Sequence, residues 1–152
     1  MADITSRPDL PWLQAAVGLG SVWDVTVARV LPERRLAELA FDGGTLLAPA
    51  GDLSAGMRVR VRIPAREVIL ASDVPKGLSL HNALPAVVSA LDPDGAVEHA
   101  VVQLRIGGAH LLAEVTRDAV ARLGLRAGQP MRALIKSVSL ELHGGGGPRA
   151  VQ

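Results

Sequence analysis

Two short segments hold the side chains best suited to binding a small anion. Residues 79–82 bring a serine, a histidine and an asparagine to the start of an expected strand, shortly after Gly77. Lys136 ends the apolar run 131–135 and is followed by Ser137. Hydroxyl, imidazole, amide and ammonium groups all donate hydrogen bonds, and together with backbone N–H groups they suit an oxyanion. Each segment also fits a simpler role, as a polar loop or as a basic residue at the solvent-facing end of a strand.

The sequence carries none of the familiar motifs for nucleotide hydrolysis or nucleophilic catalysis. The patterns G-x-x-x-x-G-K-[ST], G-x-S-x-G and H-E-x-x-H are absent, and the chain contains no cysteine. Asp92 and Asp94 flank an expected turn, where carboxylates usually bond to the local backbone. The histidines, whose spacing matches no metal signature, are His81, His99, His110 and His143. We therefore expect a chain that is not an enzyme and that offers no direct ligands to a metal.

The composition is that of a globular protein. Of the 152 residues, 49% are apolar and 20% are charged, which suffices for one domain or two small ones. The net charge of +1 and the aromatic share of 2% argue against a nucleic-acid partner. The apolar run 15–19 is too short to span a membrane and follows acidic rather than basic residues. We expect a soluble, cytoplasmic protein without direct membrane insertion.

Alternating apolar and polar residues predict short strands in both halves of the chain. The clearest pattern places Met57, Val59, Val61 and Ile63 on one face and arginines on the other. The strands expected from this period are 21–29 (with Val25 and Val27 inward), 36–41, 45–48, 57–63, 86–91, 97–106, 110–115 and 131–138. Glycine pairs at 43–44 and 107–108 predict hairpin turns between neighbouring strands.

One short helix is expected between residues 116 and 124. Thr116 suits the N-cap position, Asp118 suits the first turn, and Gly124 suits the position just beyond the last turn. The segment has room for about two turns. It directly precedes the last expected strand.

The two halves of the sequence are copies of one another. Residues 53–56 (L-S-A-G) match residues 125–128 (L-R-A-G), and the same spacing of 72 residues aligns Ile63 with Ile135. At this spacing Lys136 corresponds to Pro64, so the lysine belongs to the second copy only. Duplicated short strands predict an all-β fold of two tandem OB-fold-like small barrels, with one short helix in the second.

Residues 77–88 (G-L-S-L-H-N-A-L-P-A-V-V) resemble the Ser-x-Arg-Asn-x-Leu-x-Gly-x-Val opening of the molybdate-binding Mop domain, a member of the TOBE group. Segments further along agree in order and spacing; they are 113–116, 123–128 and 133–138. The first half is similar to the degenerate first copy in the C-terminal regulatory region of molybdate ABC transporter ATPases. The whole chain resembles that region without its ATPase domain, and stand-alone double-Mop storage proteins are similar to it.

The resemblance implies a chain of two Mop units. Residues 21–73 would form a degenerate first Mop or TOBE-like unit, and residues 74–143 would form the second. Residues 1–20 would be a partly ordered lead-in. Residues 144–152 would be a disordered, glycine-rich tail.

The resemblance also implies a site for a tetrahedral dianion, molybdate or tungstate, between Mop units. The oxyanion-binding residues that it implies are Ser79, His81, Asn82, Thr116, Ala119, Val120, Lys136 and Ser137. The three at the helix start would face the site from a partner subunit. Two departures stand out. Pro85-Ala86 spans the place of the family's glycine, and His81 stands where the family has arginine, which makes the charge at that position dependent on pH.

The implied function is that of a cytoplasmic regulatory domain of a molybdate ABC transporter ATPase. The domain would bind the oxyanion at a subunit interface and restrain transport when supply is high, with no catalytic cofactor. Its partners would be a second copy of the chain, with a dimer favoured, and the ATPase and membrane subunits of the transporter. Two alternatives stay open: a stand-alone molybdate storage or homeostasis protein, and a ligand-free dimerisation module.

Overall fold

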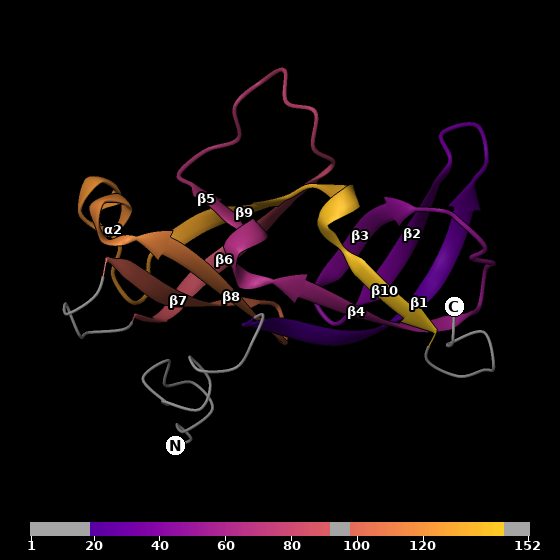
Figure 1. The fold of residues 1–152 in the computed structure, drawn as a ribbon, viewed down its shortest axis with the longest axis horizontal. Coiled ribbons are helices and arrows are strands. Elements are labelled where there is room, and N and C mark those ends of the chain that lie inside the picture. Colours follow the sequence, from indigo (N-terminus) through magenta and orange to yellow (C-terminus); the bar gives the residue numbers. More distant parts are fainter. Residues whose placement is uncertain (1–18, 92–97, 145–152) are drawn as a thin grey trace.

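The computed structural model describes residues 19–91 and 98–144 (Figure 1). The strands in these ranges are β1 (Gly20–Leu31), β2 (Leu36–Phe41), β3 (Gly44–Pro49), β4 (Arg58–Pro64), β5 (Ile69–Ala71), β6 (Asn82–Leu91), β7 (His99–Ile106), β8 (Ala109–Thr116), β9 (Pro130–Ile135) and β10 (Glu141–Gly144). The helices are two short 3-10 helices, η1 (Ala65–Glu67) and η2 (Ser137–Ser139), and the α-helix α2 (Arg117–Leu123). The predicted all-β fold, with one short α-helix in the second half, is confirmed for the described ranges.

The strands form two antiparallel sheets that exchange their end strands. One sheet has the order β10-β4-β1-β2-β3 and lies to the right in Figure 1; the other has the order β5-β9-β6-β7-β8. Strand β5, from the first half of the chain, pairs with β9, whereas β10, from the second half, pairs with β4. The sheets therefore do not coincide with the repeats at residues 21–73 and 74–143. The exchange ties the two halves together at both ends.

The core forms because each sheet buries every second residue. In β4, Val59, Val61 and Ile63 are buried, whereas Arg58 and Arg60 are exposed. This is the alternation typical of a sheet with one face in the core and the other in water. In β1, Trp23, Val25 and Val27 are buried, so the predicted inward face is confirmed. The buried residues of both sheets form one continuous hydrophobic cluster.

The helix α2 has the ends that its sequence predicted. Thr116 is the N-cap residue, and its side-chain hydroxyl accepts a hydrogen bond from the backbone N–H of Ala119 at 3.0 Å. Gly124 ends the helix in the left-handed conformation with φ of 60°, which glycine adopts at little cost. No helix in the two described ranges has both the length and the apolar content needed to cross a membrane.

The two glycine hairpins meet at their tips. The backbone N–H of Gly108 donates to Asp42 O at 3.0 Å. Gly107 has a φ of +60°, and a Cβ added there would lie 2.6 Å from the Cα of Gly43. Glycine is required at position 107 both for its backbone conformation and for this close approach.

The prediction was wrong about the last expected strand. Residues 131–138 were expected to form one strand, but β9 ends at Ile135 and is followed by η2. The chain turns here because it leaves one sheet to enter the other, where it forms β10. Strands β5 and β10 were not predicted, and β6 starts at Asn82, four residues earlier than the apolar run suggested.

Some predictions concern residues outside the described ranges. These are the lead-in up to residue 18, the turn at 92–95 and the tail from residue 145. Gly144, where the tail was expected to begin, is the last residue of β10 and pairs with Val59.

Candidate functional site

Three of the predicted site residues form a cluster at Leu47 in β3: Asn82 and Ser137 bond to its backbone, and His81 contacts Ser137. His81 ends the 72–81 loop, Asn82 begins β6, and Ser137 begins η2 just after β9. Strands β6 and β9 are neighbours in one sheet, whereas β3 is an edge strand of the other. The cluster therefore lies where the two sheets meet.

The Asn82 side chain binds the backbone of Leu47 much as a neighbouring strand would. Its Oδ1 accepts a hydrogen bond from Leu47 N at 2.8 Å, and its Nδ2 donates to Leu47 O at 3.0 Å. Asn82 is only 3% exposed, so these bonds satisfy polar groups that would be costly to leave unpaired. Asn82 holds the start of β6 against β3, and it keeps one N–H that could be offered to a ligand.

Ser137 binds the same carbonyl and connects it to His81. Its Oγ donates to Leu47 O at 2.7 Å and lies 3.3 Å from His81 Nδ1. Ser137 is 5% exposed, whereas His81 is exposed. The imidazole is therefore anchored at one nitrogen and open to solvent on its other side.

Lys136 follows β9 directly, at one end of the β6–β9 ladder. Asn82 pairs with Ile135 at that end, so His81 and Lys136 each stand one residue beyond the last pair. Both side chains are exposed.

The remaining predicted residues are not part of this cluster within one chain. Ser79 is exposed in the 72–81 loop, which rises from the upper edge of the molecule in Figure 1. Thr116, Ala119 and Val120 belong to the start of α2, at the left end of the molecule and well away from η2 (Figure 1). The hydroxyl of Thr116 caps its own helix.

The first repeat has an equivalent position with different side chains. Ser21 pairs with Ile63 as Asn82 pairs with Ile135, and its Oγ accepts a hydrogen bond from Leu112 N at 2.9 Å. The counterpart of the His81–Lys136 pair is Gly20 opposite Pro64. Ala65 stands 72 residues before Ser137. The backbone arrangement is repeated, but the lysine, imidazole and η-helix serine are not.

Two carboxylates lie on elements near the cluster, and each has a partner. Glu38 is opposite Leu47 in the β2–β3 ladder and accepts two hydrogen bonds from the Arg29 guanidinium at 3.0 Å. These hydrogen bonds lower the pKa of Glu38 and raise the pKa of Arg29. Glu67 of η1 accepts a hydrogen bond from the hydroxyl of Ser139 at 2.9 Å. Neither carboxylate bonds to His81 or Ser137.

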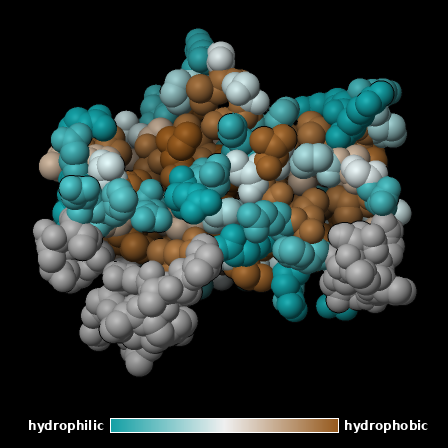
Figure 2. Space-filling view, in the orientation of Figure 1, coloured by the Kyte–Doolittle hydropathy of each residue, from teal (hydrophilic) through white to brown (hydrophobic). Residues whose placement is uncertain are grey.

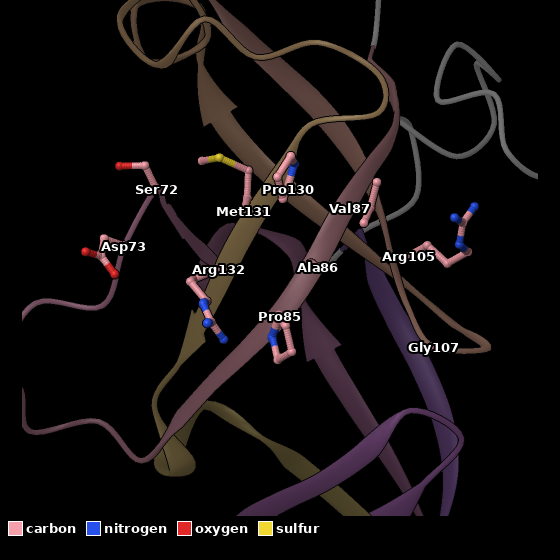
Figure 3. A pocket seen from close by; sticks show the side chains of 10 residues that line it. All are labelled: Ser72, Asp73, Pro85, Ala86, Val87, Arg105, Gly107, Pro130, Met131 and Arg132. Atoms are coloured by element: carbon pink, nitrogen blue, oxygen red, sulfur yellow. The ribbon is translucent and has the colours of Figure 1, made fainter.

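A separate pocket lies further along β6, on the outer face of its sheet (Figure 3). It has a volume of about 690 Å³, and none of the predicted site residues lines it. Arg132 and Arg105 lie on opposite sides of the Pro85–Val87 stretch of β6. In the described part of the chain, no group of three or more His, Asp or Glu side chains is arranged to hold a metal ion.

Sequence reasoning missed the residue that joins the cluster, Leu47. Its contribution is a backbone N–H and C=O, which no residue type reveals. The only signal was the Leu-Leu-Ala strand that follows a glycine hairpin in both repeats, at 46–48 and 111–113.

Residues 78–142 match the family model described as TOBE domain. This segment includes Asn82 and Ser137, which bond to Leu47, and His81, which contacts Ser137. The chain contains a TOBE domain. The TOBE domain runs from the end of the 72–81 loop through η2 into β10, so Leu47 comes from the part of the chain that precedes it.

The relatives that match most of the chain, including the part before the TOBE domain, are named as ATP-binding proteins. The chain is 43% identical over 131 residues to the molybdenum import ATP-binding protein ModC of Granulibacter bethesdensis, covering 82% of this chain and 36% of the relative. It is 40% identical over 140 residues to ModC of Thiobacillus denitrificans, covering 92% of this chain and 38% of the relative. The chain thus spans little more than a third of the length of these relatives.

One solved structure similar to the chain is that of the cytoplasmic molybdate-binding protein ModG with molybdate bound. The two match with a TM-score of 0.69 and 28% sequence identity, covering 80% of this chain and 94% of ModG. The TOBE domain and the half that precedes it therefore share the double, OB-like Mop fold that the sequence predicted.

Proposed function

We propose that this chain binds molybdate or tungstate, and that it does so as a regulatory domain of a molybdate importer ATPase. The observation that carries the proposal is a cluster of polar side chains: Asn82 and Ser137 bond to the edge strand residue Leu47, and His81 lies 3.3 Å from Ser137. Lys136 directly precedes Ser137 in the chain and is exposed. The homology to ModC proteins and the similarity to molybdate-bound ModG support the choice of ligand.

The chemistry of the cluster suits a dianion. A buried dianion is very costly without charged and N–H or O–H partners. Lys136 supplies a full positive charge, His81 supplies a ring nitrogen, and the 72–81 loop supplies the hydroxyl of Ser79. The nearby carboxylates have partners of their own: Glu38 is paired with the positive charge of Arg29, and Glu67 accepts a hydrogen bond from Ser139.

The site would be completed by a second copy of the chain. Within one chain, the hydroxyl hydrogen of Ser137 and one N–H of Asn82 are already bonded to Leu47. Further donors are therefore needed around the ion. The start of α2, with Thr116, Ala119 and Val120, would supply them from a partner, as helix starts do for anions. Val138, which directly follows Ser137 in η2, is apolar and 75% exposed. Figure 2 shows hydrophobic surface in this central region of the molecule.

When oxyanion is plentiful, binding between two copies would hold the regulatory domains together and restrain transport. The ATPase and membrane subunits of the importer would then be partners of the longer protein. In this role the chain itself binds and does not catalyse.

The similarity to ModG favours a second candidate, a stand-alone protein that stores or buffers molybdate. The match covers nearly all of ModG. Gel filtration with counting of bound molybdenum separates the candidates. A dimer with paired sites supports the regulatory role, and a larger particle with many sites supports storage. A protein that binds no molybdate in titration calorimetry contradicts both.

Replacement of Lys136 by alanine tests the site directly. A charge-assisted hydrogen bond contributes about 1.5–3 kcal/mol, so Lys136→Ala should weaken molybdate binding by about tenfold to a hundredfold in titration calorimetry. Lys76→Ala is the matched control. It removes the same charge from the exposed 72–81 loop and should change affinity by less than about threefold. Equal affinities of Lys136→Ala and the unaltered protein would remove Lys136 from the site.

A further inference from the structure

The hydrogen bonds of Ser137 determine which nitrogen of His81 carries a proton. A hydroxyl has one hydrogen, and a carbonyl oxygen has none to give. At 2.7 Å from Leu47 O, the Ser137 hydroxyl must give its hydrogen to that carbonyl. Its contact with His81 Nδ1 at 3.3 Å is then a hydrogen bond only if Nδ1 carries the hydrogen and donates to Oγ.

Asn82 makes hydrogen bonds to the same residue, Leu47. Its Nδ2 also donates to Leu47 O, and its Oδ1 is taken by Leu47 N. Asn82 and Ser137 therefore both donate to the Leu47 carbonyl, and the His81 ring donates from Nδ1 to Ser137 Oγ. A neutral ring with a hydrogen on Nδ1 has none on Nε2. The exposed side of neutral His81 presents a lone pair, which an anion would avoid.

Protonation reverses the character of that exposed side. A protonated imidazole carries a hydrogen on Nε2 and a positive charge while keeping its Nδ1–H bond to Ser137. His81 and Lys136 each stand one residue beyond the last pair of the β6–β9 ladder, so without an anion this charge would add to that of the Lys136 ammonium, and like charges repel. A dianion between the two would remove the repulsion and form a charge-assisted hydrogen bond to each.

The other charged groups on neighbouring elements do not replace the dianion in this role. Glu67 of η1 is bonded to Ser139, and Glu38 of β2 is bonded to Arg29. The His81 loop itself adds Lys76 and Asp73, of which Asp73 accepts a hydrogen bond from Val74 N. Strand β3 contributes only the backbone of Leu47 to the contacts of His81's cluster.

We propose that His81 is the residue that couples oxyanion binding to protonation: the dianion binds together with one proton, taken from solvent onto Nε2 of His81. This inference rests on the function proposed above. Because protonated His81 is favoured in the bound state, affinity is highest at low pH and falls as the pH rises through the titration of the bound state. The affinity of the domain for the oxyanion would thus be lower when the surrounding pH is higher.

Calorimetry across the titration range of histidine tests the coupling. Molybdate affinity should fall by up to about tenfold for each unit by which the pH is raised. In two buffers of different ionisation enthalpy, the heat should show uptake of up to about one proton. His81→Arg carries a permanent charge and should bind with little dependence on pH, whereas His81→Gln should bind weakly throughout.

The matched control is His99→Gln, an exposed histidine whose ring lies 3.5 Å from Glu114. It should keep the full pH dependence. A pH dependence that persists in His81→Arg, or is missing from the unaltered protein, would overturn the proposal.

A measurement without ligand separates this inference from the function on which it rests. Nitrogen chemical shifts of the ligand-free protein at high pH should show His81 with its hydrogen on Nδ1, and Ser137→Ala should abolish that preference. A hydrogen on Nε2 in the unaltered protein contradicts the coupling. If this tautomer is found but molybdate binds at no pH, the proposed function fails instead, and the coupling fails with it.

Discussion

The starts of β1 and β6 occupy equivalent positions in the two repeats, yet only the start of β6 has the imidazole, asparagine and serine of the proposed site beside it. Both contact the backbone of an edge strand, Ser21 at Leu112 and Asn82 at Leu47. At the second position an asparagine makes two such bonds and Ser137 adds a third. At the first position there is one bond. The shared feature is the attachment of one sheet to the other, and the side chains of the proposed anion site occur at the second position in addition to it.

The first position cannot be converted by simple exchange of side chains. A Cβ added to Gly20 would lie 2.6 Å from Ile63 O, closer than carbon and oxygen can approach. A histidine there would force the start of β1 away from the end of β4. The two halves have therefore diverged in backbone spacing as well as in residue type, and we expect one binding position per chain rather than two.

The largest expected effect concerns the contact that the two halves share, the meeting of the hairpin tips. Gly107→Ala should destabilise the protein by about 2–4 kcal/mol, because it adds a left-handed backbone penalty to a clash with Gly43. Gly51→Ala is the control, since its φ is +50° but no atom lies within 4 Å of the added Cβ. Thermal or urea unfolding measures both. Equal losses of stability would show that the tips do not join the two halves tightly.

An intermediate effect should distinguish the two edge-strand attachments. Asn82→Ala leaves the N–H of Leu47 without a partner and should lower the free energy of unfolding by about 2–3 kcal/mol. Ser21→Ala leaves only the N–H of Leu112 without a partner and should lower it by about 1–2 kcal/mol. Urea unfolding of both variants gives the comparison. A larger loss from Ser21→Ala would reverse the order and place the firmer attachment in the first repeat.

The smallest effect is expected at the ion pair beside the second position. Glu38→Gln should lower the melting temperature only slightly at neutral pH, because the pair with Arg29 is exposed. Since Arg29 lowers the pKa of Glu38, the pair's contribution is complete above the unfolded pKa of the carboxyl. It is lost as the pH falls through the folded pKa. Calorimetric melts of the two proteins should therefore converge in acid; a gap that widens there would contradict the assignment.

Much of the fold followed from local pattern. Alternation in β1 and β4 predicted their buried faces, and Thr116 and Gly124 predicted the ends of α2. The same reasoning extended the last strand to residue 138, because an apolar run does not show where a chain changes sheets. The sequence singled out His81, Asn82 and Ser137 as site residues, which stays a prediction; it did not reveal Leu47, the residue to which Asn82 and Ser137 bond.

Residue types and their period by themselves determined that this chain forms short amphipathic strands, that it is duplicated, and that only its second copy carries a lysine at the end of β9. The tertiary structure alone decided the exchange of β5 and β10 and the attachment of Asn82 to Leu47, 35 residues away. The reason is physical: alternation depends on neighbours along the chain, whereas a bond between a side chain and a distant peptide depends on how two sheets pack. That packing also directs the hydroxyl hydrogen of Ser137 to Leu47 O. In the proposed site, His81 must then donate from Nδ1 to Ser137, which leaves Nε2 to take up the proton.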